Sequence, residues 1–245
     1  MTGLIDSTEM YLRTLYELRE EGIPPLRARL VERLHVSAPA ASESTSRLAG
    51  EGLVALADDR TVQFTEKGLA RATAVMRKHR LAELLLTRVI GLDWPLVHNE
   101  ACRWEHVISD EVEMRLTDIL GDPKRCPFGN VIPTGSFDRP AGPRPPAPLS
   151  LLAAADFAGF RATPVTVSWI SERLQTDERT MRQLRDGGVM PGATVIVRGQ
   201  GDVVEVVSSA QDPACDEPAT IELSRRGAGL VYVERTPHER DVIMA

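Results

Sequence analysis

The chain has 245 residues and a net charge of −6, which is enough sequence for roughly two or three domains with buried cores. The three cysteines form no CxxC pair, so a disulfide scaffold is not expected and a reducing compartment is favoured. No basic segment followed by an apolar run opens the chain, and no apolar run is long enough for a bilayer. We therefore expect a cytoplasmic protein without a membrane partner. The acidic total allows DNA binding only through a local basic face.

Residues 1–73 are expected to form three helices followed by a β-hairpin. The pattern predicts a helix that opens at the capping box Asp6-Ser7-Thr8-Glu9 and ends before Gly22, helices over Leu26–Leu34 and from Ser37 to Glu51, and strands over Leu53–Ala57 and Thr61–Phe64. Two short helices joined by a tight turn, with a hairpin after them, are typical of a winged helix-turn-helix domain that binds DNA. A small α+β domain without a DNA role fits the same pattern.

Residues 74–132 are expected to be helical and to mediate dimerisation. The pattern predicts a long helix from Thr65 to a cap at Gly91, a helix over Val97–Val107 capped by Asp93, and a helix from Ser109 or Asp110 to Leu120. Their apolar faces exceed the needs of a single core, which indicates a helix-mediated homodimer.

The C-terminal half begins with a proline-rich linker at 133–150, because six prolines between 133 and 148 prevent a helix or a central strand. Five short strands and one helix are expected within residues 151–236, at Val165–Trp169, Asp177–Asp186 (the helix), Thr194–Arg198, Val203–Ser208, Thr220–Leu223 and Val231–Glu234. This arrangement favours a small SH3-like β-barrel. Residues 237–245 are expected to be a tail.

Five potential metal ligands occur at helical spacing. His79 and Glu83 are four residues apart, and Cys102, Glu105 and His106 lie within four residues of each other. Side chains at these intervals share one face of a helix. A mixture of thiolate, imidazole and carboxylate suits a divalent transition metal better than calcium or magnesium.

Each of these residues also has an ordinary structural interpretation. A single cysteine such as Cys102 is most often a small buried hydrophobe, and His98 is more often a surface or core histidine than a ligand. Catalytic zinc is the rival function for the set. However, the H-E-x-x-H order is missing, and no G-x-S-x-G or phosphate-binding loop occurs. We therefore do not expect an enzyme.

Three longer stretches carry a resemblance to a known family. They are TEMYLRTLYELREEGIPPLRARLVERL (8–34), AVMRKHRLAELLL (74–86) and HNEACRWEHVISDEVEMRL (98–116). The chain resembles the iron-dependent repressors of the diphtheria toxin repressor (DtxR/IdeR) family, with a looser match in the C-terminal third. The resemblance implies a mainly α fold with a small β domain: a winged helix-turn-helix domain at 1–73, a helical dimerisation and metal-binding domain at 74–132, and a C-terminal SH3-like domain.

The resemblance also implies two metal sites. The primary site would consist of Met10, Cys102, Glu105 and His106. The ancillary site would consist of His79, Glu83, His98, Glu172 and Gln175. A thiolate with a thioether favours Fe²⁺ over Mn²⁺ as the physiological metal, with Co²⁺, Ni²⁺, Mn²⁺ or Zn²⁺ as substitutes in vitro.

The DNA-contacting positions implied by the family are matched in part. Matching residues are Ser7, Arg27, Ser37, Pro39, Ser42, Arg47 and Arg60. Val36 and Glu43 stand where glutamines are usual, Ala40 replaces a threonine, and Gly50 replaces an arginine. Glu43 can only accept hydrogen bonds, for example from cytosine N4; otherwise it points to solvent. These departures predict a paralogue that reads a different operator.

Two functions follow from this comparison of patterns. The first is an Fe²⁺-dependent repressor of iron-homeostasis genes that binds a palindromic double-stranded operator as one or two homodimers. In that function, metal binding orders the N-terminal helix that carries Met10. The alternative is a metal-binding regulator with weak or altered DNA specificity or, less favoured by the motifs, a metalloenzyme.

Overall fold

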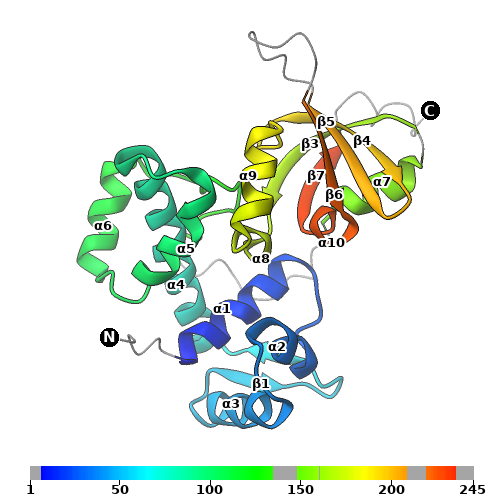
Figure 1. Ribbon diagram of the computed structural model, residues 1–245. Helices are drawn as coiled ribbons and strands as arrows, with labels where there is room; N and C mark the ends of the chain where they lie inside the picture. Colours follow the sequence, from blue (N-terminus) through cyan, green and yellow to red (C-terminus); the bar gives the residue numbers. More distant parts are fainter. Residues whose placement is uncertain (1–6, 135–147, 160, 209–218, 236–245) are drawn as a thin grey trace, which may run out of the picture. The chain divides into compact units, whose positions relative to one another are not determined.

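The computed structural model describes residues 7–134, 148–159, 161–208 and 219–235 (Figure 1). The chain divides into two units, each described by itself below. Unit 1 comprises residues 1–82, 101–124 and 132–147, and unit 2 comprises residues 83–100, 125–131 and 148–245. The expected linker falls mostly, and the expected tail entirely, outside the described residues. The domain boundaries expected from the sequence remain predictions.

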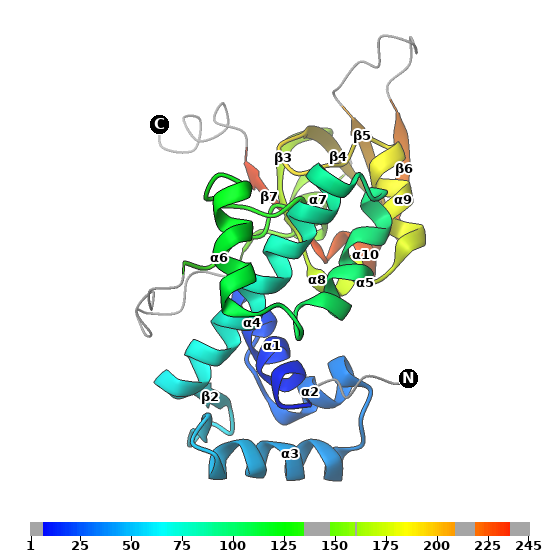
Figure 2. The ribbon, with the colours of Figure 1, turned by 90° about the vertical axis from the view of Figure 1, so that its left-hand side faces the viewer.

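Unit 1 begins with the helices and hairpin expected from the sequence. The elements are α1 (Ser7–Glu20), α2 (Arg27–Leu34), α3 (Ala38–Gly50), β1 (Val54–Leu56), β2 (Val62–Phe64) and α4 (Glu66–Leu85). Helix α3 starts at Ala38 because the Ser37 side chain accepts a hydrogen bond from the Ala40 amide and Pro39 is tolerated in the first turn. In Figure 2, α3 lies along the lower edge of unit 1, below α1 and α2.

A single apolar core holds these elements together. Its buried members come from α1, α2, α3, the hairpin and α4: Tyr11, Leu12, Leu15, Leu18, Leu30, Leu48, Leu53, Val54, Val62 and Ala72. Gly68 allows α4 to approach the hairpin closely, because a Cβ at this position would lie 1.8 Å from the Leu53 carbonyl oxygen. The core therefore fixes α1 and α3 in one rigid arrangement.

The helical region differs from expectation at three helix ends. Helix α4 ends at Leu85 and continues as a π-helical turn over Leu86–Ile90, closed by Gly91 at φ 75°. Helix α5 covers Trp94–Trp104, so the expected range of 97–107 was wrong by three residues at each end. Pro95 fits the first turn of a helix, whose amides need no intrahelical partner. Helix α6 covers Asp110–Ile119 and is capped by Ser109, as expected.

Unit 2 is built on a five-stranded antiparallel sheet in the order β6-β5-β4-β3-β7. The strands are β3 (Thr163–Ile170), β4 (Thr194–Gln200), β5 (Val203–Ser208), β6 (Thr220–Ser224) and β7 (Val231–Arg235). Alternate valines such as Val195 and Val197 are buried, because side chains alternate between the faces of a strand. All five strands were expected.

Four helices precede or connect the strands of this sheet in unit 2. They are α7 (Leu151–Ala158), α8 (Glu172–Gln175), α9 (Glu178–Asp186) and α10 (Arg225–Ala228). Only α9 was expected; its cap, Asp177, accepts hydrogen bonds from the amides of Arg179 and Thr180. Among all the helices that the structure describes, none combines the length and apolarity that a membrane-spanning segment needs.

Candidate metal centre

The Glu105 carboxylate is the centre of a buried polar cluster in unit 1. The side chain is 1% exposed, and its Oε2 lies 2.6 Å from His79 Nδ1. His106 Nε2 lies 3.2 Å from Oε1. The guanidinium Nη1 of Arg13 donates to both carboxylate oxygens at 3.0 Å. Two helices of the expected metal-binding region and α1 therefore converge on one carboxylate.

Cys102 completes the donor set of this cluster. Its Sγ accepts a hydrogen bond from Arg13 Nη1 at 3.2 Å, and the ligand atoms of His79 and Cys102 lie within 4.8 Å of one another. Cys102 and Glu105 are three residues apart at the end of α5. One turn of helix thus presents sulfur and oxygen donors to the same space, as the spacing predicted.

Charge stabilises the ionised form of Glu105. Burial opposes ionisation, but the positive charge of Arg13, together with His79 and a hydrogen bond from His106, holds the pKa of Glu105 well below its usual range. The hydrogen bond to Glu105 raises the pKa of His106 above 6.5; burial opposes this effect and Glu9 reinforces it. The cluster therefore contains a fixed carboxylate that needs a cation beside it.

Three of the four expected ligands of the primary site come together, and the fourth, Met10, is partly exposed. Cys102, Glu105 and His106 come together in this cluster, whereas the Met10 side chain is 39% exposed. Met10 precedes Arg13 by three residues on α1. Among the described contacts, it is Arg13 that reaches Cys102 and Glu105.

Two residues of α1 that contact the cluster were not identified from the sequence. Glu9 accepts from His106 Nδ1 at 2.7 Å and from Arg71 at 3.3 Å, and Arg13 is held by Glu17 at 3.0 Å. The only signal in the sequence is spacing, since Glu9, Arg13 and Glu17 recur every four residues and therefore share one face of α1.

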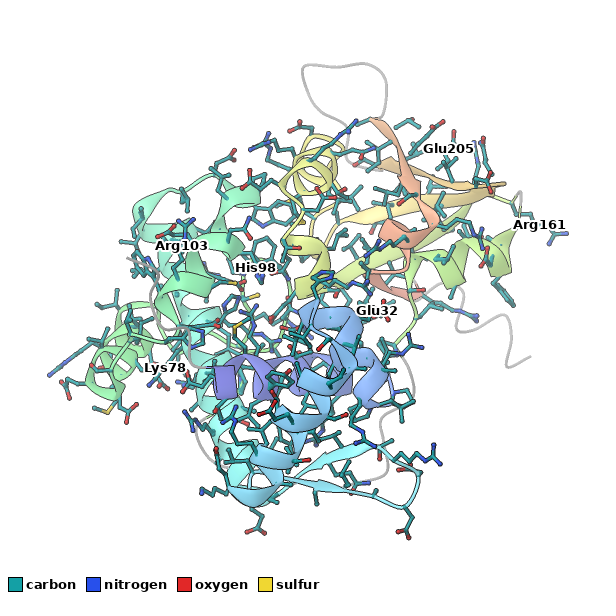
Figure 3. All side chains as sticks on the ribbon, turned by 60° about the horizontal axis from the view of Figure 1, so that its bottom comes forward. Glu32, Lys78, His98, Arg103, Arg161 and Glu205 are labelled. Atoms are coloured by element: carbon teal, nitrogen blue, oxygen red, sulfur yellow. The ribbon has the colours of Figure 1, made fainter. Side chains whose placement is uncertain are left out.

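The ancillary set divides between the two units. His79 belongs to unit 1, and the other four residues belong to unit 2. Within unit 2, His98 Nδ1 lies 3.3 Å from Glu83 Oε1, and both side chains are 1% exposed; Figure 3 labels His98 on α5. Glu172 and Gln175 lie on α8 and are also buried.

The side-chain amide of Gln175 is held in place by two hydrogen bonds. Its Nε2 donates to the Ile170 carbonyl at 2.7 Å and to Asn130 Oδ1 at 3.1 Å. Because the atom that makes these bonds is a donor, it is the amide nitrogen, and the other amide atom is the oxygen Oε1. Oε1 is buried with no hydrogen-bond donor among the described residues. A buried acceptor without a donor is costly unless it binds an ion or water.

The donors in both units suit a divalent transition metal. Thiolate and imidazole donors in unit 1, and imidazole, carboxylate and amide oxygen donors in unit 2, are those that such ions prefer. The assignment of individual residues as ligands remains a prediction.

The expected DNA contacts lie on unit 1. Ser37, Pro39, Glu43 and Arg47 are exposed on or just before α3, and Ser42 is half-buried. Arg60 is exposed in the hairpin turn at φ 65°. The other two are the first residues of helices: Arg27, half-buried at the start of α2, and Ser7 at the start of α1. These residues stay predicted contacts.

Comparison with known proteins identifies the two N-terminal regions. The family model "Iron dependent repressor, N-terminal DNA binding domain" matches residues 3–62. The model "Iron dependent repressor, metal binding and dimerisation domain" matches residues 65–134.

Individual proteins are similar over most of the chain. The iron-dependent repressor IdeR of Mycobacterium tuberculosis is 50% identical over 198 residues, covering 80% of this chain and 86% of that protein. The diphtheria toxin repressor of Corynebacterium diphtheriae is 49% identical over 195 residues, covering 80% and 85%. A solved manganese-dependent transcriptional repressor in complex with manganese superposes with a TM-score of 0.75 at 30% identity, covering 94% of this chain and all of that one.

These similarities confirm the expected family and fold, including the SH3-like C-terminal domain. They do not favour the metalloenzyme alternative, since the relatives are repressors. With both family models matched and half of the aligned residues identical to a curated relative, the chain belongs to the iron-dependent repressors of the diphtheria toxin repressor family.

Proposed function

We propose that the protein is an Fe²⁺-dependent transcriptional repressor of iron-homeostasis genes, which binds palindromic double-stranded operators as one or two homodimers. The supporting observation is a continuous set of contacts from the Glu105 cluster to α3. His106 contacts Glu9 on α1 at 2.7 Å, and Thr8, the residue before Glu9, accepts from Arg47 on α3 at 2.9 Å.

These contacts give a physical route from metal to DNA. Of the proposed primary ligands, Cys102 lies in the last turn of α5 and Glu105 and His106 come just after it. Met10 belongs to α1. Residues that bind the same ion from two segments favour the state in which both segments are ordered. The bound ion would supply a divalent charge that the thiolate, carboxylate and imidazole share. The first turn of α1, with Ser7, would then be fixed beside α3.

The ancillary ligands are proposed to be His79, Glu83, His98, Glu172 and Gln175. The buried Gln175 Oε1 supports this assignment, because an ion would supply the partner that it lacks among the described residues. Fe²⁺ is the proposed physiological metal, and Co²⁺, Ni²⁺, Mn²⁺ and Zn²⁺ are proposed substitutes, since the donor set discriminates weakly among these ions.

DNA contact is proposed for the exposed edge formed by α3 and the hairpin. Pro39, Glu43 and Arg47 on α3 would face the major groove, while Arg60 and Arg27 would contact phosphates.

Exposed apolar residues support a dimer contact around α6: Val107, Val112, Met114 and Ile119. Such a group of apolar side chains is typical of an interface.

Selection of bound sequences from a random double-stranded DNA pool tests this function directly. We expect enrichment of one palindrome with Fe²⁺ under anaerobic conditions and none with a chelator. The Cys102→Ala variant should lose the metal dependence, whereas Cys126→Ala, which removes a buried cysteine of unit 2, should retain it. If no sequence is enriched by the wild-type protein with Fe²⁺, the repressor function is wrong.

A further inference from the structure

Arg13 occupies the position of a cation at the donor atoms expected to bind metal. Its Nη1 lies 3.0 Å from each oxygen of Glu105 and 3.2 Å from Cys102 Sγ. The Arg13 side chain is only 12% exposed, so the guanidinium is held inside the cluster rather than in solvent. All of these contacts lie within unit 1.

A metal ion and the guanidinium cannot share this space. An ion bound to a thiolate and a carboxylate lies roughly 2.0–2.3 Å from each donor atom. Nη1 lies within hydrogen-bonding distance of the same three atoms, so an ion at these atoms would meet it. Two positive charges at such a separation repel strongly in a buried site.

We infer that Arg13 is an internal competitor of the metal, which neutralises Glu105 in the metal-free protein and must leave before Cys102 and Glu105 bind an ion. The inference rests on the proposed function, because it takes these residues as ligands. It assigns to Arg13, which is not one of the proposed ligands, a control on the metal affinity of Cys102 and Glu105.

The neighbouring residues provide a place for the displaced side chain. Glu17 already accepts from Arg13 Nε at 3.0 Å, so the guanidinium can retain one ionic partner after it turns away from Glu105. Met10 lies three residues earlier on α1, on the same face of the helix, and is 39% exposed. Arg13 and Met10 are therefore placed to exchange positions beside Cys102.

The competition affects metal affinity and stability in opposite directions. Without the Arg13 charge, the metal-free protein buries Glu105 with a weaker set of partners and loses stability. The ion then displaces nothing when it binds, so the affinity rises. Coupling between two binding events typically changes an affinity by about 5- to 150-fold, and the lower end of this range is the effect expected for Arg13.

The experiment compares the Co²⁺ affinity of the wild-type, Arg13→Gln and Arg19→Gln proteins. The affinity is measured by thiolate-to-cobalt charge-transfer absorption and by calorimetry. Arg19 is exposed on the same helix, so its variant removes an equal charge away from the cluster. We expect Arg13→Gln to bind Co²⁺ at least about fivefold more tightly and to unfold more easily when metal-free, while Arg19→Gln matches wild type. Arg13→Lys keeps the charge, so its Co²⁺ affinity should lie between those of wild type and Arg13→Gln. It replaces Arg13→Gln in the comparison if the glutamine variant does not fold.

The outcomes separate this inference from the proposed function. Equal or weaker Co²⁺ affinity in both Arg13 variants, with wild-type binding that depends on Cys102, overturns the competition and leaves the repressor intact. Loss of Co²⁺ affinity in Arg13→Gln alone would show that Arg13 supports the ligands, which also overturns it. Wild-type protein that binds no Co²⁺ through Cys102 would overturn both.

Discussion

The Arg47 guanidinium donates a hydrogen bond to Thr8 Oγ1 at 2.9 Å, although 39 residues separate them in the sequence. Arg47 lies on α3, the helix proposed to contact DNA, and Thr8 lies in the first turn of α1, beside Glu9. Since Glu9 in turn contacts His106, the two contacts link the Glu105 cluster with the helix proposed to contact DNA, inside unit 1.

Replacement of Thr8 by valine should weaken the effect of metal on DNA binding without changing metal binding. Valine keeps the shape of threonine but removes the acceptor, and a single hydrogen bond contributes about 1 kcal/mol, or about fivefold in an equilibrium. DNA affinity with and without Fe²⁺, measured by fluorescence anisotropy, gives the ratio to compare. Glu51→Gln is the control, since it removes the negative charge of the ion pair that Arg47 forms with Glu51 and leaves Thr8 unchanged. An unchanged ratio in Thr8→Val would exclude this route.

The Gly50→Arg substitution should strengthen DNA binding in a salt-dependent manner. Gly50 is the last residue of α3, and a Cβ there would meet nothing within 4 Å, so a longer side chain has room. A new phosphate contact should make the dependence of log affinity on log salt steeper by about 0.9 for each phosphate neutralised. Gly50→Ala is the control, because it changes helix propensity by up to about 1 kcal/mol without adding charge. The same salt slope in both variants would place Gly50 away from the phosphates.

Stability of the metal-free protein should fall as pH rises above about 6.5 because of His106. Its pKa is raised in the folded state, chiefly by the hydrogen bond to Glu105. A raised folded pKa gives a contribution that is complete below the unfolded value of about 6.5 and is lost as pH rises through the folded value. Urea unfolding in chelator at a series of pH values measures this loss, and His106→Gln should flatten it. If the free energy of unfolding changes with pH in the same way in wild type and His106→Gln, the pH dependence does not come from His106.

Two metal ions should bind each chain at independent residues. Co²⁺ titration should give two equivalents for wild type and one for His98→Ala, because His98 belongs to the ancillary set alone. Cys102→Ala should lose the thiolate absorption and retain the other equivalent. His35→Asn is the control for loss of an imidazole, since His35 is exposed and its φ of 53° suits asparagine. Loss of both equivalents in His98→Ala would show that the two sites are not separate.

Local patterns in the sequence predicted most of the elements. The first three helices and the hairpin begin and end within two residues of the expected positions, because caps, prolines and apolar spacing act over a few residues. The helix Trp94–Trp104 was misplaced by three residues, since the sequence signals compete at Pro95. The short helices α8 and α10, of four residues each, have too few turns to show a period.

The sequence by itself determined which donor atoms this protein can offer, because Cys102, Glu105 and His106 lie within one turn and their spacing needs no tertiary structure. Only the tertiary structure decided what stands opposite them. Arg13 meets Glu105 across 92 residues, and Glu9 meets His106 across 97. Such contacts depend on how α1 packs on the core, which buries Leu12 and Leu15 on one face and turns Glu9 and Arg13 toward the Glu105 cluster. Packing therefore placed a cation at the proposed metal site.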